Sequence, residues 1–262
     1  MVVLKALALG IVEGVTEFLP ISSTGHLIVA SSLIDYPATS RETFEIFIQM
    51  GAILAVVWHY WRQLLQLVTA SAADDQARSL IGKVLLAFLP AAVVGFLFHR
   101  IIEDYLFSTR VVAASLIVGG VLIVVLERIQ LRFDVQQIDK ARWTQSLWVG
   151  LAQVFSLVPG VSRAGATIIG GMLAGLNRPV ATQFSFYLSI PTMCAASLYS
   201  LLKARHLLSL HDVLPLSVGF VAAFVSALIV VRAFIGFVQR HDFTGFGYYR
   251  ILAGLTVLFF VG

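Results

Sequence analysis

The sequence has little charge and almost no cysteine. Only 12% of its 262 residues are Asp, Glu, Lys or Arg, whereas soluble domains carry about a quarter. Cys194 is the single cysteine, which excludes an intrachain disulfide and a cysteine-based metal site. Long polar segments are also lacking, because the longest connections, about 69–79 and 128–143, leave no room for a soluble catalytic domain. Any chemistry is therefore expected within or at a membrane.

Several familiar motifs are absent as well. The chain has no phosphate-binding loop, no histidine pair at zinc-binding spacing and no dinucleotide fingerprint. The run GVSRAG (160–165) is not a hydrolase nucleophile elbow, because its second glycine comes one place late. Acid-phosphatase lipid enzymes place His and Asp at fixed offsets after Ser-Arg, and those offsets hold Ile169 and Leu173 here. The net charge of +4 points to membrane topology and not to a nucleic-acid partner.

Long apolar runs dominate what is present. Hydrophobic residues make up 59% of the chain and are gathered into runs such as VVAASLIVGGVLIVVL (111–126). About 20 consecutive apolar residues are needed to cross a bilayer as a helix. We therefore predict an all-α integral membrane protein with six transmembrane helices, at roughly 43–62, 80–99, 110–127, 181–202, 213–233 and 246–262.

Two further apolar segments, 2–34 and 146–176, do not fit as simple spans. Each is interrupted by a Pro/Ser/Gly cluster, LPISSTG (19–25) in the first and VPGVSRAG (158–165) in the second. The pieces on either side are too short to cross alone. Non-helical backbone at membrane depth occurs only where protein buries it or where it lines a wet cavity. We predict two re-entrant helical hairpins with their breaks inside the protein.

The two breaks also suggest an internal repeat. A shift of 140 residues aligns them and places Ser22 on Ser162. The single membrane domain, 1–262, then consists of repeat one, about 1–128, and repeat two, about 144–262. Each repeat has one hairpin and three spans, so the second copy must be inverted in the membrane. Inverted repeats with broken helices place the functional site near the midplane, where the breaks meet.

The distribution of Lys and Arg predicts the orientation. Six of the 18 lie in segments on the side of residue 1, eleven, including Arg250, on the other side, and Arg163 is inside the second break. Cytoplasmic loops carry the excess of Lys and Arg. Both termini and the mouth of the first hairpin are therefore expected to face outward.

Two acids and one arginine are placed where charge is costly. Glu13 and Glu17 are four residues apart, on one face of a helix, where like charges repel. Ionisable groups inside a membrane are functional by default, and Arg163 offers a planar fork of donors that suits phosphate. Two acids and one base leave room for a metal ion. The alternative is that both acids are structural, one of them protonated, with Arg163 as their counter-ion.

The first break adds hydroxyl groups and an imidazole. Ser22, Ser23 and Thr24 precede His26, whose neutral ring can take or give a proton near pH 7. His26 reaches Ser23 if residues 23–26 form a helical turn. The alternative for His26 is that it only packs and forms hydrogen bonds.

These residues resemble the undecaprenyl-diphosphate phosphatase family, also called bacitracin-resistance phosphatases. The first hallmark is an acidic pair four residues apart followed by SSTGH (22–26). The second is Pro-Gly-x-Ser-Arg-Ser-x-x-Thr, present as PGVSRAGAT (159–167) with Ala164 in place of the usual serine. That departure makes a hydroxyl group at 164 dispensable in this chain. The resemblance extends along nearly the whole chain.

The resemblance implies an activity and roles for these residues. The family removes the terminal phosphate of undecaprenyl diphosphate, a lipid that carries cell-wall precursors, at the outer face of the bacterial plasma membrane with a divalent cation. Glu13 and Glu17 would hold Mg²⁺ or Ca²⁺, Arg163 would stabilise the phosphoryl oxygens, and His26 would move the proton. The attacking group would be Ser23, less favourably Ser22, or a water. Substrate-binding residues would be Ser22, Thr24, Ser162, Gly165 and Thr167.

A transporter or flippase of a phosphorylated lipid is the rival prediction, because inverted repeats and a midplane site fit it equally well. A carrier binds phosphate without cleaving it, and a proton-handling His26 beside three hydroxyl groups favours hydrolysis. The sequence leaves the oligomeric state open, a homodimer being one option.

Overall fold

The computed structural model describes all of the chain except residues 37, 205–211 and 261–262. The described residues form helices and connections without any strand, apart from one isolated bridge between Val135 and Leu176. The α-helices are α1 (Val2–Thr16), α2 (Ser23–Leu33), α3 (Ala38–His59), α4 (Trp61–Ala70), α5 (Asp75–Leu106), α6 (Thr109–Arg128), α7 (Trp143–Val154), α8 (Arg163–Leu173), α9 (Arg178–Ala204), α10 (Val213–Val238) and α11 (Thr244–Phe260). The predicted all-α class is confirmed.

Four helices are long and apolar enough to cross a membrane, namely α5, α6, α9 and α10. A fifth crossing is formed if α3 and α4 count as one span, although the chain bends by 69° between them. Helix α11 matches the predicted span 246–262, but its described part has only 17 residues and residues 261–262 lie outside the described part. The described chain therefore has four to five candidate spans, as a multi-pass protein requires, and the arrangement with six spans stays a prediction.

The two predicted breaks are present and share a backbone feature. Ser22 in the first break has φ +71° and Ser162 in the second has φ +73°, a region that residues other than glycine rarely occupy. An 11-residue helix follows each, α2 in the first case and α8 in the second. A shift of 140 residues brings both ends of α2 onto those of α8. The two segments therefore have the same local architecture.

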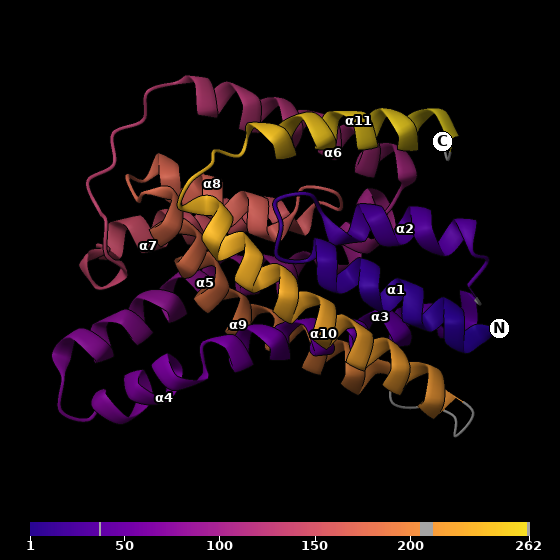
Figure 1. Ribbon diagram of the computed structural model, residues 1–262, viewed down its shortest axis with the longest axis horizontal. Coiled ribbons are helices and arrows are strands. Elements are labelled where there is room, and N and C mark those ends of the chain that lie inside the picture. The colour runs from indigo at the N-terminus through magenta and orange to yellow at the C-terminus, as the bar shows by residue number, and fades with distance from the viewer. Residues whose placement is uncertain (37, 205–211, 261–262) are drawn as a thin grey trace.

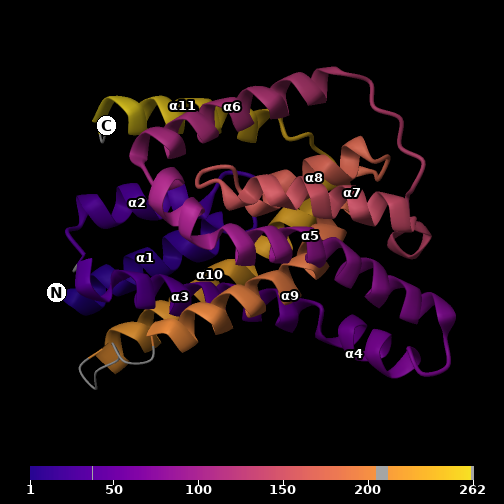
Figure 2. The same ribbon diagram turned by 180° about the vertical axis from the view of Figure 1, so that it is seen from behind.

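The broken segments enter the molecule from opposite ends. Both chain termini and the α1–α2 segment lie at one end, whereas the connection from α6 to α7 lies at the other end, next to the α7–α8 segment (Figures 1 and 2). Helix α1 packs on α10, and α7, its counterpart at the 140-residue shift, packs on α5. The breaks consequently meet in the interior of the bundle.

Glycines allow these helices to approach each other closely. A Cβ added at Gly10 of α1 would lie 2.3 Å from the carbonyl oxygen of Gly219 in α10. A Cβ at Gly150 of α7 would lie 2.5 Å from the carbonyl oxygen of Ala87 in α5. Small residues at membrane helix contacts permit such backbone approach. Gly10 and Gly150 are equivalent at the 140-residue shift, so the same glycine of each broken segment sets how closely that segment packs on its supporting helix.

Helices α6 and α11 form a separate antiparallel pair along one side of the bundle (Figure 1). Gly120 of α6 has room for no side chain, because a Cβ there would lie 2.6 Å from the carbonyl oxygen of Gly247 in α11. A Cβ at Gly254 would likewise lie 2.8 Å from the carbonyl oxygen of Ala113. This tight packing sets the register of α11 next to the breaks.

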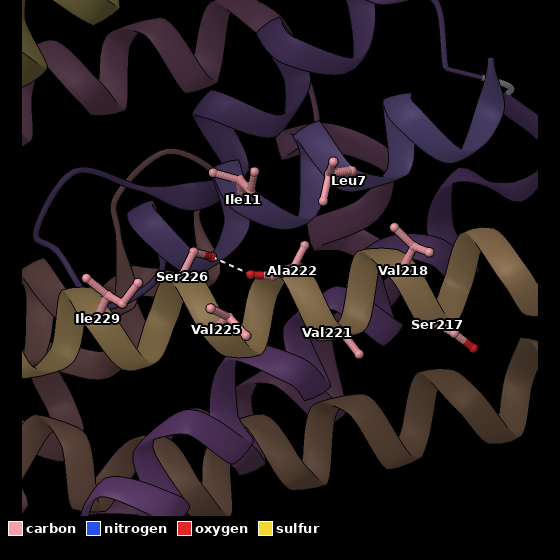
Figure 3. Close-up of a pocket in the computed structure, with 9 residues that line it drawn as sticks. All are labelled: Leu7, Ile11, Ser217, Val218, Val221, Ala222, Val225, Ser226 and Ile229. Atoms are coloured by element: carbon pink, nitrogen blue, oxygen red, sulfur yellow. Dashed lines mark hydrogen bonds between the residues drawn. The ribbon is translucent and has the colours of Figure 1, made fainter.

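The outer side of the contact between α1 and α10 carries an apolar groove of about 650 Å³ (Figure 3). Leu7 and Ile11 of α1 line it together with Val225 and Ile229 of α10. Ser226 also lines it, but its hydroxyl donates to the carbonyl of Ala222 within α10. The groove offers a mostly aliphatic surface that suits lipid chains, and its only other lining hydroxyl among the described residues is that of Ser217.

Candidate active site

The two breaks contact each other directly and bring two helix N-termini together. The Ser162 hydroxyl donates to the carbonyl of Leu19 at 3.4 Å. Helix α2 begins at Ser23 and α8 begins at Arg163, each immediately after its positive-φ serine. A helix N-terminus exposes backbone N–H groups and carries a partial positive charge, so it favours anions. The meeting point of the breaks is therefore an electropositive position inside an apolar bundle.

Arg250 of α11 holds this junction together, with only 1% of its surface exposed. Its guanidinium donates to Pro20 O in the first break at 3.1 Å and to Val161 O in the second at 2.9 Å. Further bonds go to carbonyl oxygens of the second break and of α6, which belong to Gly160, Ser115 and Leu116. One side chain thus ties both breaks to α6.

The charge count places Arg250 on the side opposite residue 1, and the structure corrects this, because the side chain is buried inside the bundle. The reason lies in its surroundings, because the carbonyls of both breaks are free of helical bonding and need a donor. Two glycines make room for the guanidinium: a Cβ at Gly119 would lie 2.2 Å from Nη2, and one at Gly165 would lie 3.3 Å from Nη1. A lone arginine in the apolar run of α11 was the available signal.

Ser23, Glu17 and Arg163 form a chain of hydrogen bonds at the junction. The Ser23 hydroxyl donates to Glu17 Oε2 at 2.5 Å, and Arg163 Nη2 donates to Glu17 Oε1 at 3.0 Å. The side chains of Arg163 and Glu17 are 10% and 7% exposed. A hydroxyl paired with a base that a third group orients is the arrangement of an activated nucleophile. The predicted pairing of the first break's acid with Arg163 is present.

Arg163 is held by contacts on several sides and has one unpaired N–H donor. Nη1 donates to the carbonyl of Ser185 at 3.4 Å, and the guanidinium carbon lies 5.5 Å from the centroid of the Phe18 ring. The buried Nε–H has no hydrogen-bond partner among the described residues. A buried unpaired donor is costly unless a ligand uses it. The guanidinium is therefore fixed in place and able to accept an anion.

Glu13 lies one turn before Glu17 on α1 and is 2% exposed. Its Oε2 atom has no hydrogen-bond partner in the described part of the chain. A carboxylate oxygen with unused acceptor capacity in a buried place is a suitable ligand for a hard cation such as Mg²⁺ or Ca²⁺. The described residues contain no group of three His, Cys, Asp or Glu side chains placed to bind a metal. A cation here would rely on the two carboxylates together with other oxygen ligands, which Mg²⁺ and Ca²⁺ prefer.

His26 does not hydrogen-bond to Ser23. Its Nδ1 is 2.7 Å from the carbonyl oxygen of Ser22, and its Nε2 is 2.6 Å from the hydroxyl of Tyr249 in α11. The expected helical turn over residues 23–26 is formed, yet the imidazole points toward α11. Glu17 is therefore the base in contact with Ser23. Sequence reasoning missed Tyr249, which no motif marks.

The remaining predicted residues surround this chain of bonds. Ser22 is buried as the N-cap of α2, and Thr24 is half-buried on the first turn of that helix. The Ser162 hydroxyl caps α8 by accepting the Gly165 N–H at 3.0 Å. Thr167 is fully buried, with its hydroxyl 2.6 Å from that of Ser185. The structure thus brings the predicted residues of both breaks together, with Thr167 behind the site.

Comparison with known proteins identifies the family. The model of the family described as bacitracin resistance protein BacA matches residues 6–256. Undecaprenyl-diphosphatase 2 of Rhodospirillum rubrum is 51% identical over 256 residues, 97% of this chain and 93% of that protein. The undecaprenyl-diphosphatase of Nitrosospira multiformis is 50% identical over 255 residues, with the same coverage. That of Aromatoleum aromaticum is 48% identical over 253 residues, 97% of this chain and 92% of that protein. This chain therefore belongs to the bacitracin resistance protein BacA family.

Proposed function

We propose that this protein is a membrane-embedded phosphatase that hydrolyses undecaprenyl diphosphate to undecaprenyl phosphate and inorganic phosphate. The observation that carries the proposal is the bonded chain Ser23–Glu17–Arg163 at the meeting point of two helix N-termini. Relatives with about 50% identity over nearly the whole chain are undecaprenyl-diphosphatases. The reaction would recycle the lipid that carries cell-wall precursors and would confer resistance to bacitracin.

Binding of the diphosphate follows from the charges at the junction. The N-termini of α2 and α8 and the guanidinium of Arg163 attract phosphoryl oxygens. The unpaired Nε–H of Arg163 is a donor for one of these oxygens. These groups are held before substrate arrives, and prearranged donors stabilise the charge that develops in the transition state. The lipid tail would remain in the apolar surroundings of the bundle.

Ser23 is the favoured attacking group. In the proposed step the Ser23 oxygen bonds to the terminal phosphorus, its proton passes to Glu17, and the bond from phosphorus to the bridging oxygen breaks. Undecaprenyl phosphate leaves, and a water then hydrolyses the phosphoserine to release phosphate and restore Ser23. The contact of 2.5 Å between Ser23 and Glu17 supports Glu17 as the acceptor of this proton. Attack by a water that the site positions is the alternative, and it needs no serine.

A divalent cation, Mg²⁺ or Ca²⁺, fits the acidic pair. Glu13 and Glu17 would hold it, since the free Oε2 of Glu13 is a buried acceptor without a partner in the described chain. When bound, such an ion supplies positive charge that neutralises phosphoryl oxygens. Glu17 also receives bonds from Arg163 and Ser23, so it links the cation site to the attacking group.

We further propose six transmembrane helices arranged as two inverted-topology repeats in the bacterial plasma membrane, with the site reached from the outer face. The opposed entry of the two broken segments and the exchange of packing partners between halves support the repeat. With Arg250 placed inside the bundle, ten Lys and Arg remain on the side of the α6–α7 connection and six on the side of the termini. The positive-inside rule thus still assigns the termini to the outer face.

A detergent assay separates hydrolysis from transport, because no transport occurs without a membrane. The purified protein is mixed with undecaprenyl diphosphate, and released phosphate is measured with and without a chelator. We expect release that the chelator abolishes, and release lost by at least about a hundredfold in Glu17→Gln and Arg163→Ala. Arg240→Ala, an exposed arginine outside the site, serves as the control. Specific lipid binding without phosphate release would favour the transporter instead.

A further inference from the structure

His26 has both ring nitrogens engaged, and neither partner belongs to the chain of Ser23, Glu17 and Arg163. Nδ1 lies 2.7 Å from the carbonyl oxygen of Ser22, and Nε2 lies 2.6 Å from the hydroxyl of Tyr249. The two rings are nearly parallel, with 3° between their planes and 5.5 Å between centroids. Such contacts fix both the position and the rotation of the imidazole.

These partners decide where the proton of His26 resides. A carbonyl oxygen only accepts hydrogen bonds, so Nδ1 must carry a proton in order to bond to Ser22. In the neutral ring Nε2 is then the accepting nitrogen, and the Tyr249 hydroxyl must donate to it. When the ring is charged, Nε2 carries a proton and the same hydroxyl accepts. A phenol can therefore bond to Nε2 in both the neutral and the charged ring. An aliphatic side chain, or one that only donates, could not.

Both partners are themselves held in place. The carbonyl of Ser22 is directed by the positive φ of that residue at the start of α2. Tyr249 precedes Arg250, whose guanidinium is bonded to both breaks, and follows Gly247, which packs against α6. The Tyr249 side chain is 45% exposed. Its hydroxyl therefore joins an internal imidazole to an accessible surface of the protein.

We infer that Tyr249 is a positioning residue of the proposed phosphatase: its hydroxyl bonds to Nε2 of His26 and, together with the Ser22 carbonyl on Nδ1, fixes the orientation of the imidazole. The inference rests on the proposed function for its effect on turnover, but the tautomer of His26 is independent of turnover. Helix α11 thus contributes to the site twice, by joining the breaks through Arg250 and by holding His26 in place through Tyr249.

The chain offers a matched pair of substitutions. Tyr249→Phe removes the hydroxyl and keeps the ring that lies parallel to His26. Tyr248→Phe makes the same change at the neighbouring tyrosine, whose hydroxyl accepts from Arg128 at 3.4 Å. We expect Tyr249→Phe to lower kcat on the order of tenfold or more with KM changed less than about twofold, since one hydrogen bond to the imidazole is lost. Tyr248→Phe should match the parent, and both variants should melt within about 2 °C of it.

Two further measurements show whether Tyr249 acts through His26. In a His26→Ala background, Tyr249→Phe should cause no additional loss, because residues that act as one unit are not additive. A full further tenfold loss there would overturn the inference, as would parent-like kcat in Tyr249→Phe alone.

The tautomer is tested without any assay of activity. In protein labelled with ¹⁵N-histidine, the ring signals of His26 are distinguished from those of the other five histidines because they disappear in His26→Gln. We expect a protonated Nδ1 and an unprotonated Nε2 at neutral pH, with the Nε2 signal moved by Tyr249→Phe and not by Tyr248→Phe. An Nε2 signal that Tyr249→Phe leaves in place would overturn the inference. Absence of phosphate release by the parent would instead count against the proposed function, while this spectrum would still decide the role of Tyr249.

Discussion

Replacing Arg250 by lysine is expected to destabilise the protein strongly, although the charge is kept. The guanidinium donates to five backbone carbonyls, three of them in the breaks (Pro20, Gly160 and Val161) and two in α6. A lysine ammonium has three donors at one point and cannot reproduce the fork of arginine. At least two carbonyls in this buried place would then lose their donor.

The magnitude follows from these two groups. A buried polar group left without its partner costs about 1–3 kcal/mol, so Arg250→Lys should lower the free energy of unfolding by about 2–6 kcal/mol. For a chain of this size 1 kcal/mol corresponds to roughly 2–4 °C, which gives a fall in Tm of roughly 5–20 °C. Phosphate release should fall as well, because the breaks that present Ser23 and Arg163 would no longer be joined.

The assay is thermal unfolding of the purified protein in one detergent, followed by phosphate release at a temperature where the variant is folded. Arg240→Lys provides the matched control, since that arginine is exposed at the end of α10 and its replacement should shift Tm by less than about 2 °C. A Tm of Arg250→Lys within about 2 °C of the parent would mean that the five bonds do not hold the junction, and the reasoning would be refuted.

Three further outcomes are expected. If Ser23 attacks phosphorus, Ser23→Ala should lower the rate of phosphate release by at least about a thousandfold. Ser22→Ala should lower it on the order of tenfold. A Ser23→Ala enzyme within tenfold of the parent would identify water as the attacking group. Gly14→Ala should destabilise the protein by about 1–3 kcal/mol in thermal unfolding, because the added Cβ would lie 2.4 Å from a carbonyl oxygen of α10. Gly236→Ala is the control, since a Cβ there has nothing within 4 Å, and it should leave the stability unchanged. A cysteine at exposed Gln136, in a background without the native cysteine, should resist an impermeant reagent in intact cells, and its rapid labelling would reverse the orientation.

Local features of the site could be predicted wherever the sequence itself contained both the motif and the residue that it pairs with. The helix breaks follow from Pro/Ser/Gly clusters in apolar runs, and their alignment at 140 residues anticipated the matching φ of Ser22 and Ser162. The pairing of Glu17 with Arg163 also followed, because a buried charge needs a counter-charge. Each of these inferences concerned charged or helix-breaking residues, which can be accommodated inside an apolar bundle in only a few ways.

What could not be predicted depends on backbone groups and on helix register. The carbonyls that bind Arg250 come together only once both breaks and α6 are in place, so no pattern in α11 predicts them. The orientation of His26 toward Tyr249 depends in the same way on how α11 packs on α6. The 69° bend after His59 ends α3 before the end of the predicted span 43–62, although α3 and α4 together are apolar enough to cross a membrane. Hydropathy records composition and does not record where the axis of a helix turns.

The dependence of the junction on Arg250 has a consequence for how the protein is made. The acidic pair enters the membrane with α1, but the residue that joins the two breaks lies in α11, which is synthesised after α1 to α10. Until α11 is inserted, the carbonyls of the breaks lack their donor and His26 lacks Tyr249. The candidate site is therefore completed only when α11 is in place, and a chain that ends before α11 is expected to be inserted in the membrane without activity.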